Sequence, residues 1–218
     1  MGDLNDGGGN NTLIFPSGGA GTIDGNVIFG LGLDRVEVHS GDITGNVQQG
    51  SGTDHFFMTG GVNTAVSAFT AGQLSNVVNA GRIDLTNGGD STSDTFTING
   101  NYIGNGGLLF LSTALGADVS PSDRLVISSG TASGTISIGI VNNGGAGAST
   151  VRDGIMVVEA VNGATTAGGA FALGDRVAAG AYEYFLYRGG VSAGAGENWY
   201  LRSTLTAGSP PPRRLRRL

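Results

Sequence analysis

The sequence predicts an all-β protein whose short strands wind into a parallel β-helix. Residues Ile23–Asp34 return as Ile43–Asp54 in the shared pattern I-x-G-N-V-x-x-G-x-G-x-D, shifted by 20 residues. Apolar residues alternate after each copy, and glycine contributes 42 of 218 residues. A fixed period in this range, with short strands and glycine-rich turns, is typical of a solenoid whose coils bury their apolar faces by stacking.

The strand module consists of an Asp followed by apolar residues two and four positions later. Because successive strand side chains point to opposite faces, these two positions should both face the inside of the coil. The Asp54–Asp94 and Asp94–Asp123 intervals are 40 and 29 residues, which predicts insertions in later coils and an additional coil around Gly81–Leu85. The module follows Asp34, Asp54, Asp94 and Asp123. Its apolar pairs are, in the same order, Val36 and Val38, Phe56 and Met58, Phe96 and Ile98, and Leu125 and Ile127.

The amino-acid composition argues against several classes of protein and of binding partner. Glycine without a strict G-X-Y period excludes collagen, and the alternating apolar residues argue against disorder. All 11 basic residues are Arg, and residues 1–209 carry 7 Arg against 17 acidic residues, which argues against nucleic acid or anionic lipid as a partner. The absence of Cys rules out disulfides and thiolate metal sites and permits export through an oxidising compartment.

Along the chain, residues 1–11 are polar and glycine-rich and are expected to be a frayed N-terminal segment. Residues 12–117 are expected to form the coils, with a first strand at Thr12–Phe15 that Pro16 ends. The clearest later strands are Leu74–Asn79 and Gly107–Thr113.

The phrase Phe96–Leu111, followed by Leu115–Ile127, strongly resembles the C-terminal passenger region of pertactin-like autotransporters, the self-secreted (type V) surface proteins of Gram-negative bacteria. Later segments are similar to successive landmarks of that family in the same order: Gly154–Val158, Phe171–Leu173, Gly180–Tyr187 and Asn198–Ser203. The resemblance implies a right-handed β-helix and a non-enzymatic protein of the cell surface or extracellular space, displayed for adhesion or virulence.

Aromatic residues concentrate near the C-terminal end of the chain. Because each aromatic side chain buries a large area, they are expected to be well packed and to cap the solenoid. The resemblance implies that residues 118–206 form an autochaperone region, which folds first outside the cell and templates the other coils. The residues expected to serve this folding role are Tyr182, Tyr184, Phe185, Tyr187, Trp199 and Tyr200.

Members of the family continue into an outer-membrane translocator barrel, which the resemblance implies as a partner. Here residues 207–218 form a Pro- and Arg-rich tail that is expected to be disordered and cannot span a membrane. A host surface or extracellular matrix is a further expected partner, and the protein is expected to be a monomer without a cofactor.

Two Asp residues are candidate calcium ligands. Gly30–Val36 and Gly50–Phe56 match the core of the calcium-binding pattern G-G-x-G-x-D-x-U-x, in which Asp and turn carbonyls supply oxygen ligands. The tandem nine-residue spacing is absent, so we favour no metal site. Asp34 and Asp54 are expected to be turn residues whose carboxylates accept backbone N–H groups.

Asn26 and Asn46 recur at equivalent corners, and Asn101 follows more loosely. Their amides are expected to stack into a ladder along the solenoid or to occupy left-handed turns, both of which are structural roles.

Two alternatives to the autotransporter interpretation stay open: a carbohydrate-active β-helix enzyme, such as a polysaccharide lyase or hydrolase, and a calcium-stabilised secreted module. Carbohydrate-cleaving sites need clustered acidic residues, whereas the carboxylates here are spread along the repeats. We therefore predict no catalytic residues.

Overall fold

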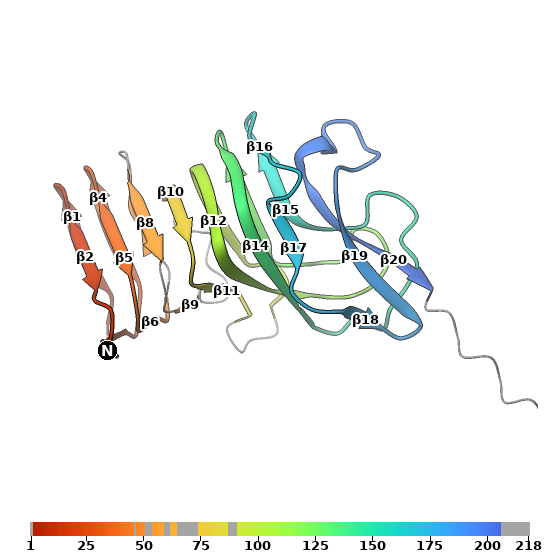
Figure 1. Ribbon diagram of the computed structural model, residues 1–218, viewed down its shortest axis with the longest axis horizontal. Helices are drawn as coiled ribbons and strands as arrows, with labels where there is room; N and C mark the ends of the chain where they lie inside the picture. The colour runs from red at the N-terminus through yellow and green to blue at the C-terminus, as the bar shows by residue number, and fades with distance from the viewer. Residues whose placement is uncertain are drawn as a thin grey trace, which may run out of the picture.

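The computed structural model describes residues 2–45, 47–50, 54–58, 62–64, 74–86 and 91–205. Asn46 and the tail 207–218 lie outside these ranges. The described chain is all-β apart from one short 3₁₀ turn, and its strands stack side by side from the N-terminal to the C-terminal end (Figure 1).

Three columns of parallel strands run along the stack, and each pass through the columns is one coil. The first column contains β1 (Leu4–Gly8), β4 (Val27–Leu31) and β7 (Val47–Gln48). The second contains β2 (Thr12–Phe15), β5 (Arg35–Val38), β8 (His55–Met58) and β10 (Leu74–Asn79). The third contains β3 (Thr22–Ile23), β6 (Asp42–Ile43), β9 (Val62–Thr64) and β11 (Arg82–Asp84).

The 20-residue repeat sets the register of the early coils. Val27 pairs with Val47, and Arg35 pairs with His55, so equivalent residues of the two phrases lie beside each other. The predicted inward-facing positions are confirmed wherever the side chain is described, since all of them are buried: Val36, Val38, Phe56, Phe96, Ile98, Leu125 and Ile127. The expected coil around Gly81–Leu85 is also present as β11.

Longer strands build the later coils. The strand β12 (Thr95–Thr113) pairs with β10 in its first half and β11 in its second, and it joins the second and third columns into one 17-stranded sheet. Parallel pairing continues to β17. These strands are β13 (Arg124–Ser128), β14 (Thr131–Asn142), β15 (Ile155–Val161), β16 (Thr165–Thr166) and β17 (Phe171–Leu173).

The N-terminal segment differs from the expectation of a frayed end. Leu4–Gly8 forms β1 and pairs in parallel with β4, although all five residues are exposed. The pairing is made by backbone hydrogen bonds; for example, the Leu4 N–H donates to Asn26 O at 2.8 Å. Backbone hydrogen bonds do not require apolar side chains, so the composition of the segment did not reveal the strand.

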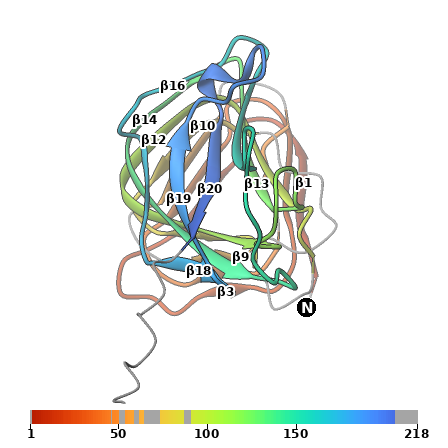
Figure 2. The same ribbon diagram turned by 90° about the vertical axis from the view of Figure 1, so that its right-hand side faces the viewer.

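Strand direction changes at the C-terminal end. The strands β18 (Val177–Ala179), β19 (Tyr182–Arg188) and β20 (Trp199–Leu205) pair antiparallel, and β20 also pairs antiparallel with β15. A 3₁₀ turn, η1 (Ala195–Glu197), lies in the loop between β19 and β20. Figure 2 shows these strands facing the viewer at the end of the stack, and we call residues 177–205 the cap.

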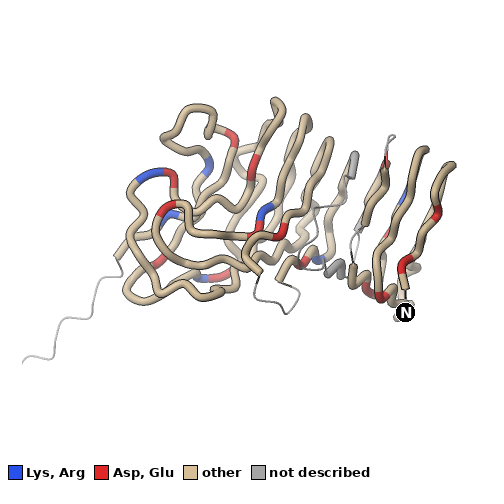
Figure 3. The backbone as a smooth tube through the Cα atoms, turned by 180° about the vertical axis from the view of Figure 1, so that it is seen from behind, with Lys and Arg blue, Asp and Glu red and all other residues tan. Residues whose placement is uncertain are grey.

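Charge is distributed unevenly along the stack (Figure 3). Residues 2–58 contain seven acidic residues and one basic residue, Arg35. Within the described residues, no helix has the length and apolarity needed to cross a membrane.

Candidate functional site

The cap is the candidate site because the predicted folding residues gather there. Trp199 begins β20, is 4% exposed, and donates its indole N–H to Thr166 Oγ1 at 3.0 Å. Burying the indole removes a large apolar area from water, and the Thr166 hydroxyl pairs its only polar atom. Trp199 therefore joins the cap to the preceding coil by both packing and hydrogen bonding.

A chain of aromatic rings runs from Trp199 into the coils. The Trp199 ring lies edge-on to Phe171 with centroids 5.3 Å apart, and Phe171 stacks on Tyr102 at 6.2 Å. Burial raises the pKa of Tyr102, whose hydroxyl accepts the Asn79 side-chain N–H at 3.0 Å. This row of side chains, with Asn79 at its end, connects β20, β17, β12 and β10. Packing of the cap therefore depends on residues spread over about a hundred positions of sequence.

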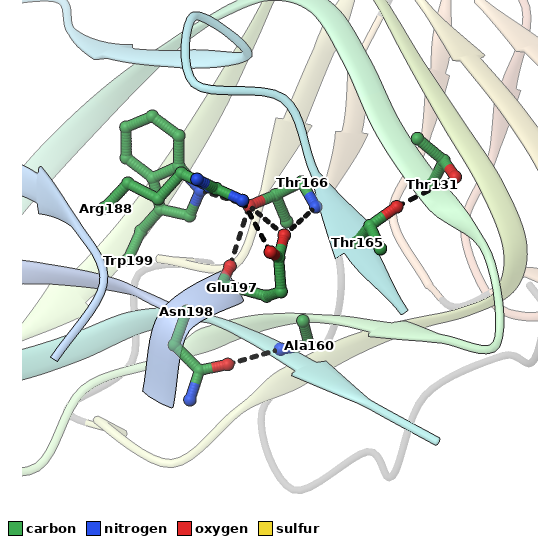
Figure 4. Close-up of polar contacts among 8 residues, drawn as sticks. All are labelled: Thr131, Ala160, Thr165, Thr166, Arg188, Glu197, Asn198 and Trp199. Carbon is green, nitrogen blue, oxygen red and sulfur yellow. Dashed lines mark hydrogen bonds and ion pairs between the residues drawn. The ribbon is translucent and has the colours of Figure 1, made fainter. Parts of the chain in front are cut away.

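A polar network lies beside the indole N–H (Figure 4). The Glu197 carboxylate accepts the Thr166 backbone N–H at 2.6 Å and pairs with the Arg188 guanidinium at 2.6 Å. Arg188 also donates to Thr166 Oγ1 at 3.1 Å. The Thr166 N–H, followed by Arg188, lowers the pKa of Glu197, so the carboxylate is ionised at neutral pH. Nearby, Asn198 Oδ1 accepts the Ala160 N–H at 2.8 Å.

Tyr184 fixes the other end of the cap. It is 1% exposed, and its hydroxyl oxygen lies 2.9 Å from Gly116 O and accepts the Ala148 N–H at 3.0 Å. The hydroxyl thus links β19 to two loops that lie 68 and 36 residues earlier.

Two carboxylates organise the loops beside the cap. Asp118 accepts three backbone N–H groups, from Val151, Arg152 and Gly154, at 2.6–3.0 Å. Partial burial acts to raise the pKa of Asp118, but these hydrogen bonds outweigh it and lower the pKa. Asp153 accepts the Ser192 N–H at 3.0 Å and also that of Val191.

The other expected folding residues are less enclosed. Tyr200 is buried and Tyr182 is partly buried, whereas Phe185 and Tyr187 are exposed on the outer face of β19. The Arg202 guanidinium lies over the Tyr187 ring at 5.3 Å. The cap therefore buries Trp199, Tyr184 and Tyr200 and leaves Phe185 and Tyr187 exposed.

The ladder predicted from Asn26 and Asn46 stays a prediction, and an asparagine contact is observed further along the stack. Asn101 donates to Asn76 Oδ1 at 3.3 Å and accepts the Thr131 N–H at 3.1 Å, so these residues link three successive coils. Asn26 donates to Asp3 Oδ1 at 3.0 Å, and its predicted partner Asn46 lies outside the described residues.

Asp34 and Asp54 accept backbone N–H groups, as expected of turn residues. Asp34 Oδ1 accepts the Asn11 N–H at 2.9 Å, and Asp54 Oδ1 accepts the Asp34 N–H at 3.0 Å. Asp123 does the same for the Asp94 N–H at 2.9 Å. Burial, opposed by hydrogen bonds and reinforced by neighbouring Asp residues, raises the pKa of Asp123 to about 6. The described residues contain no group of three or more His, Asp or Glu side chains placed to hold a metal ion.

Sequence reasoning missed Thr166, Arg188 and Glu197. Thr166 and Glu197 are 31 positions apart and lie in segments without a repeat. A weak signal was available, because Glu197 lies two residues before the only Trp in the chain.

Comparison with known families decides the relationship. Residues 72–186 match the model of the family described as Autochaperone Domain Type 1. The chain belongs to the autotransporter passengers. The match covers the expected autochaperone region from residue 118 to 186 and begins earlier, among the coils.

Autotransporter relatives support this assignment. The Adhesin BmaC autotransporter of Brucella suis is 38% identical over 80% of this chain, and the Autotransporter adhesin AIDA-I of Escherichia coli is 41% identical over 53%. The Probable autotransporter YfaL of Escherichia coli is 34% identical over 88% of this chain. The aligned regions span 5%, 9% and 16% of those three proteins, respectively.

Proposed function

We propose that the chain is a right-handed parallel β-helix in which residues 118–206 act as an autochaperone for residues 12–117. The parallel register of the three strand columns supports the β-helix. The handedness follows from the family resemblance. The single observation that carries the proposal is the aromatic chain Trp199–Phe171–Tyr102, which joins the cap to the coils.

The proposed mechanism follows from the energetics of a stack. Each coil contacts only its neighbours, so the first coil to form loses chain entropy without a surface on which to pack. The cap reduces this cost, because its antiparallel hairpin β19–β20 is local in sequence and holds β15 by direct pairing. Folding then proceeds by adding β12, β10 and earlier strands to an ordered edge.

We infer that the protein is a non-enzymatic passenger displayed on the Gram-negative outer membrane, and that it works as a monomer. Its partners in this proposal are the translocator barrel that exports it and a host surface or extracellular matrix that it adheres to. Adhesion is supported by the names of two relatives, which are called adhesins.

Limited proteolysis of the full chain tests the autochaperone assignment. Fragments are identified by mass spectrometry during a time course in moderate urea. We expect cleavage in residues 12–80 first and survival of a fragment covering residues 118–205, because the cap network is lost only in global unfolding. Simultaneous loss of both regions, or earlier cleavage of the cap, would contradict the proposal.

A further inference from the structure

One corner of the early coils holds three polar side chains in the interior. Asp34 is 1% exposed, and Gln49 and Asp54 are 0% exposed. Gln49 occupies the position that Phe29 occupies in the preceding coil, since Val27 pairs with Val47 and Ile28 with Gln48. A buried polar side chain thus lies next to the buried aromatic ring of the preceding coil.

Hydrogen bonds bring these three residues to the same corner. The Asp34 N–H donates to Asp54 Oδ1 at 3.0 Å, and the His55 N–H donates to Asp34 O at 2.9 Å. The Gln49 side-chain N–H donates to His55 O at 3.0 Å. The Gln49 amide and the Asp34 backbone therefore both bond to His55, the residue that follows Asp54.

Two oxygens at this corner are buried and have no hydrogen-bond partner within the described part of the chain. These are Asp34 Oδ2 and Gln49 Oε1. Both are acceptors, so each requires a donor or a cation. Buried polar oxygens are normally paired, so these two atoms make the corner a candidate site for a cation.

The local charge also favours a cation. Asp34 makes no ion pair among the described residues. Arg35 is the only basic residue between 2 and 58, and it points outward to pair with Glu37. Buried carboxylates are generally paired with a cationic group or bound to a metal ion.

We propose that this corner binds a divalent cation of the calcium type. Asp34 Oδ2 and Gln49 Oε1 are the primary protein ligands, and the Asp54 carboxylate adds charge at the same corner. Carboxylate and amide oxygens are the hard ligands that calcium prefers, whereas His55, the nearest nitrogen ligand, has an exposed side chain. The ion would fasten two adjacent coils to each other.

Thermal unfolding of the full chain with calcium as the probe tests this site. The chain is freed of metal with EDTA and melted at constant ionic strength with 0 or 5 mM CaCl₂, and in parallel with MgCl₂. Extracellular calcium modules bind with Kd on the order of 10⁻⁴–10⁻³ M. A tenfold excess over Kd should raise Tm by about 3–6 °C. An unchanged Tm would overturn the proposal.

Three variants separate a specific site from general charge screening. Asp34→Asn keeps an acceptor for the Asn11 N–H and should abolish the calcium shift. Gln49→Met, which preserves the side-chain shape without the oxygen, should reduce or abolish it as well. Asp24→Asn removes an exposed charge from the same coils and should keep the full shift.

Other outcomes count against the site. If Asp24→Asn loses the shift as fully as Asp34→Asn, calcium acts through screening and the proposal fails. If calcium has no effect while Asp34→Asn raises Tm, a neutral side chain suits the corner better than a carboxylate with a bound cation, and the proposal also fails.

Discussion

Replacing Trp199 by Ala should destabilise the protein more than any other single aromatic substitution in the cap. Trp199 is buried, packs edge-on against Phe171, and gives its only polar hydrogen to Thr166. The substitution leaves a cavity between β20 and β17 and removes one of the hydrogen bonds made by the Thr166 hydroxyl, which keeps its contacts with Arg188 and Glu197. The aromatic chain into the coils then loses its first member.

The expected loss can be estimated from these contacts. Buried Phe or Trp to Ala substitutions cost about 3–5 kcal/mol in unfolding free energy, which includes the cavity. The edge-on aromatic contact contributes about 0.5–1.5 kcal/mol and the indole hydrogen bond about 1 kcal/mol. Because these contributions overlap, we expect a total of about 4–5 kcal/mol and not their sum.

Urea denaturation and stopped-flow refolding of the full chain measure the effect. Trp199→Phe keeps most of the ring but loses the hydrogen bond, so it should cost about 1–2 kcal/mol. Tyr187→Ala is the matched surface control, since Tyr187 is 45% exposed on the same hairpin, and it should cost less than about 1 kcal/mol.

If the cap forms early, Trp199→Ala should slow folding by most of its equilibrium effect. A loss below about 1.5 kcal/mol would refute the packing argument. A large loss that appears only as faster unfolding would refute the early formation of the cap.

Three further predictions concern loops, a buried carboxylate and coil spacing. Asp118→Asn should cost about 1–3 kcal/mol at pH 7, because the carboxylate accepts three backbone N–H groups. Because the pKa of Asp118 is lowered in the folded state, the wild type should be more stable than the variant at neutral pH, and the difference should shrink as pH falls below about 4. Equal unfolding free energies of the two proteins at pH 7 would contradict this prediction. Asp123, with its pKa raised from 3.8 to about 6, keeps its proton longer in the folded state, so its contribution is full below pH 3.8 and is lost as pH rises through 6. Denaturation between pH 4 and 7 should show this decline in the wild type and not in Asp123→Asn, and identical slopes would count against it. Gly130→Ala should destabilise strongly because its Cβ would lie 1.7 Å from Gly100 O of the adjacent coil, whereas Gly168→Ala meets nothing within 4 Å and should be nearly neutral by the same measurement.

The coils were predictable because their signals are local. The 20-residue phrase fixes which residues stack, and the alternation after Asp34 and Asp54 fixes which side chains face inward. Both signals come from neighbouring stretches of sequence, so contacts between distant segments are not needed to recognise them. The strand β1 escaped prediction because its pairing uses only backbone groups.

The position of the cap in the chain could be predicted from the sequence, but the arrangement of its side chains could not. The concentration of Tyr and Trp marked the region, yet alternation cannot distinguish the buried Tyr184 from the exposed Tyr187, because the antiparallel pairing of β19 and β20 decides which face is covered. The contact between Thr166 and Glu197 joins segments without a repeat, and only the three-dimensional arrangement reveals it.

The order in which protection appears during refolding tests the central claim most directly. Pulse-labelling hydrogen exchange, read by mass spectrometry on the full chain, follows the amides of residues 155–205 and of residues 12–58 after dilution from urea. The autochaperone account predicts that the cap amides become protected first and that the early coils follow. Protection of residues 12–58 before the cap, or of both regions in a single step, would contradict it.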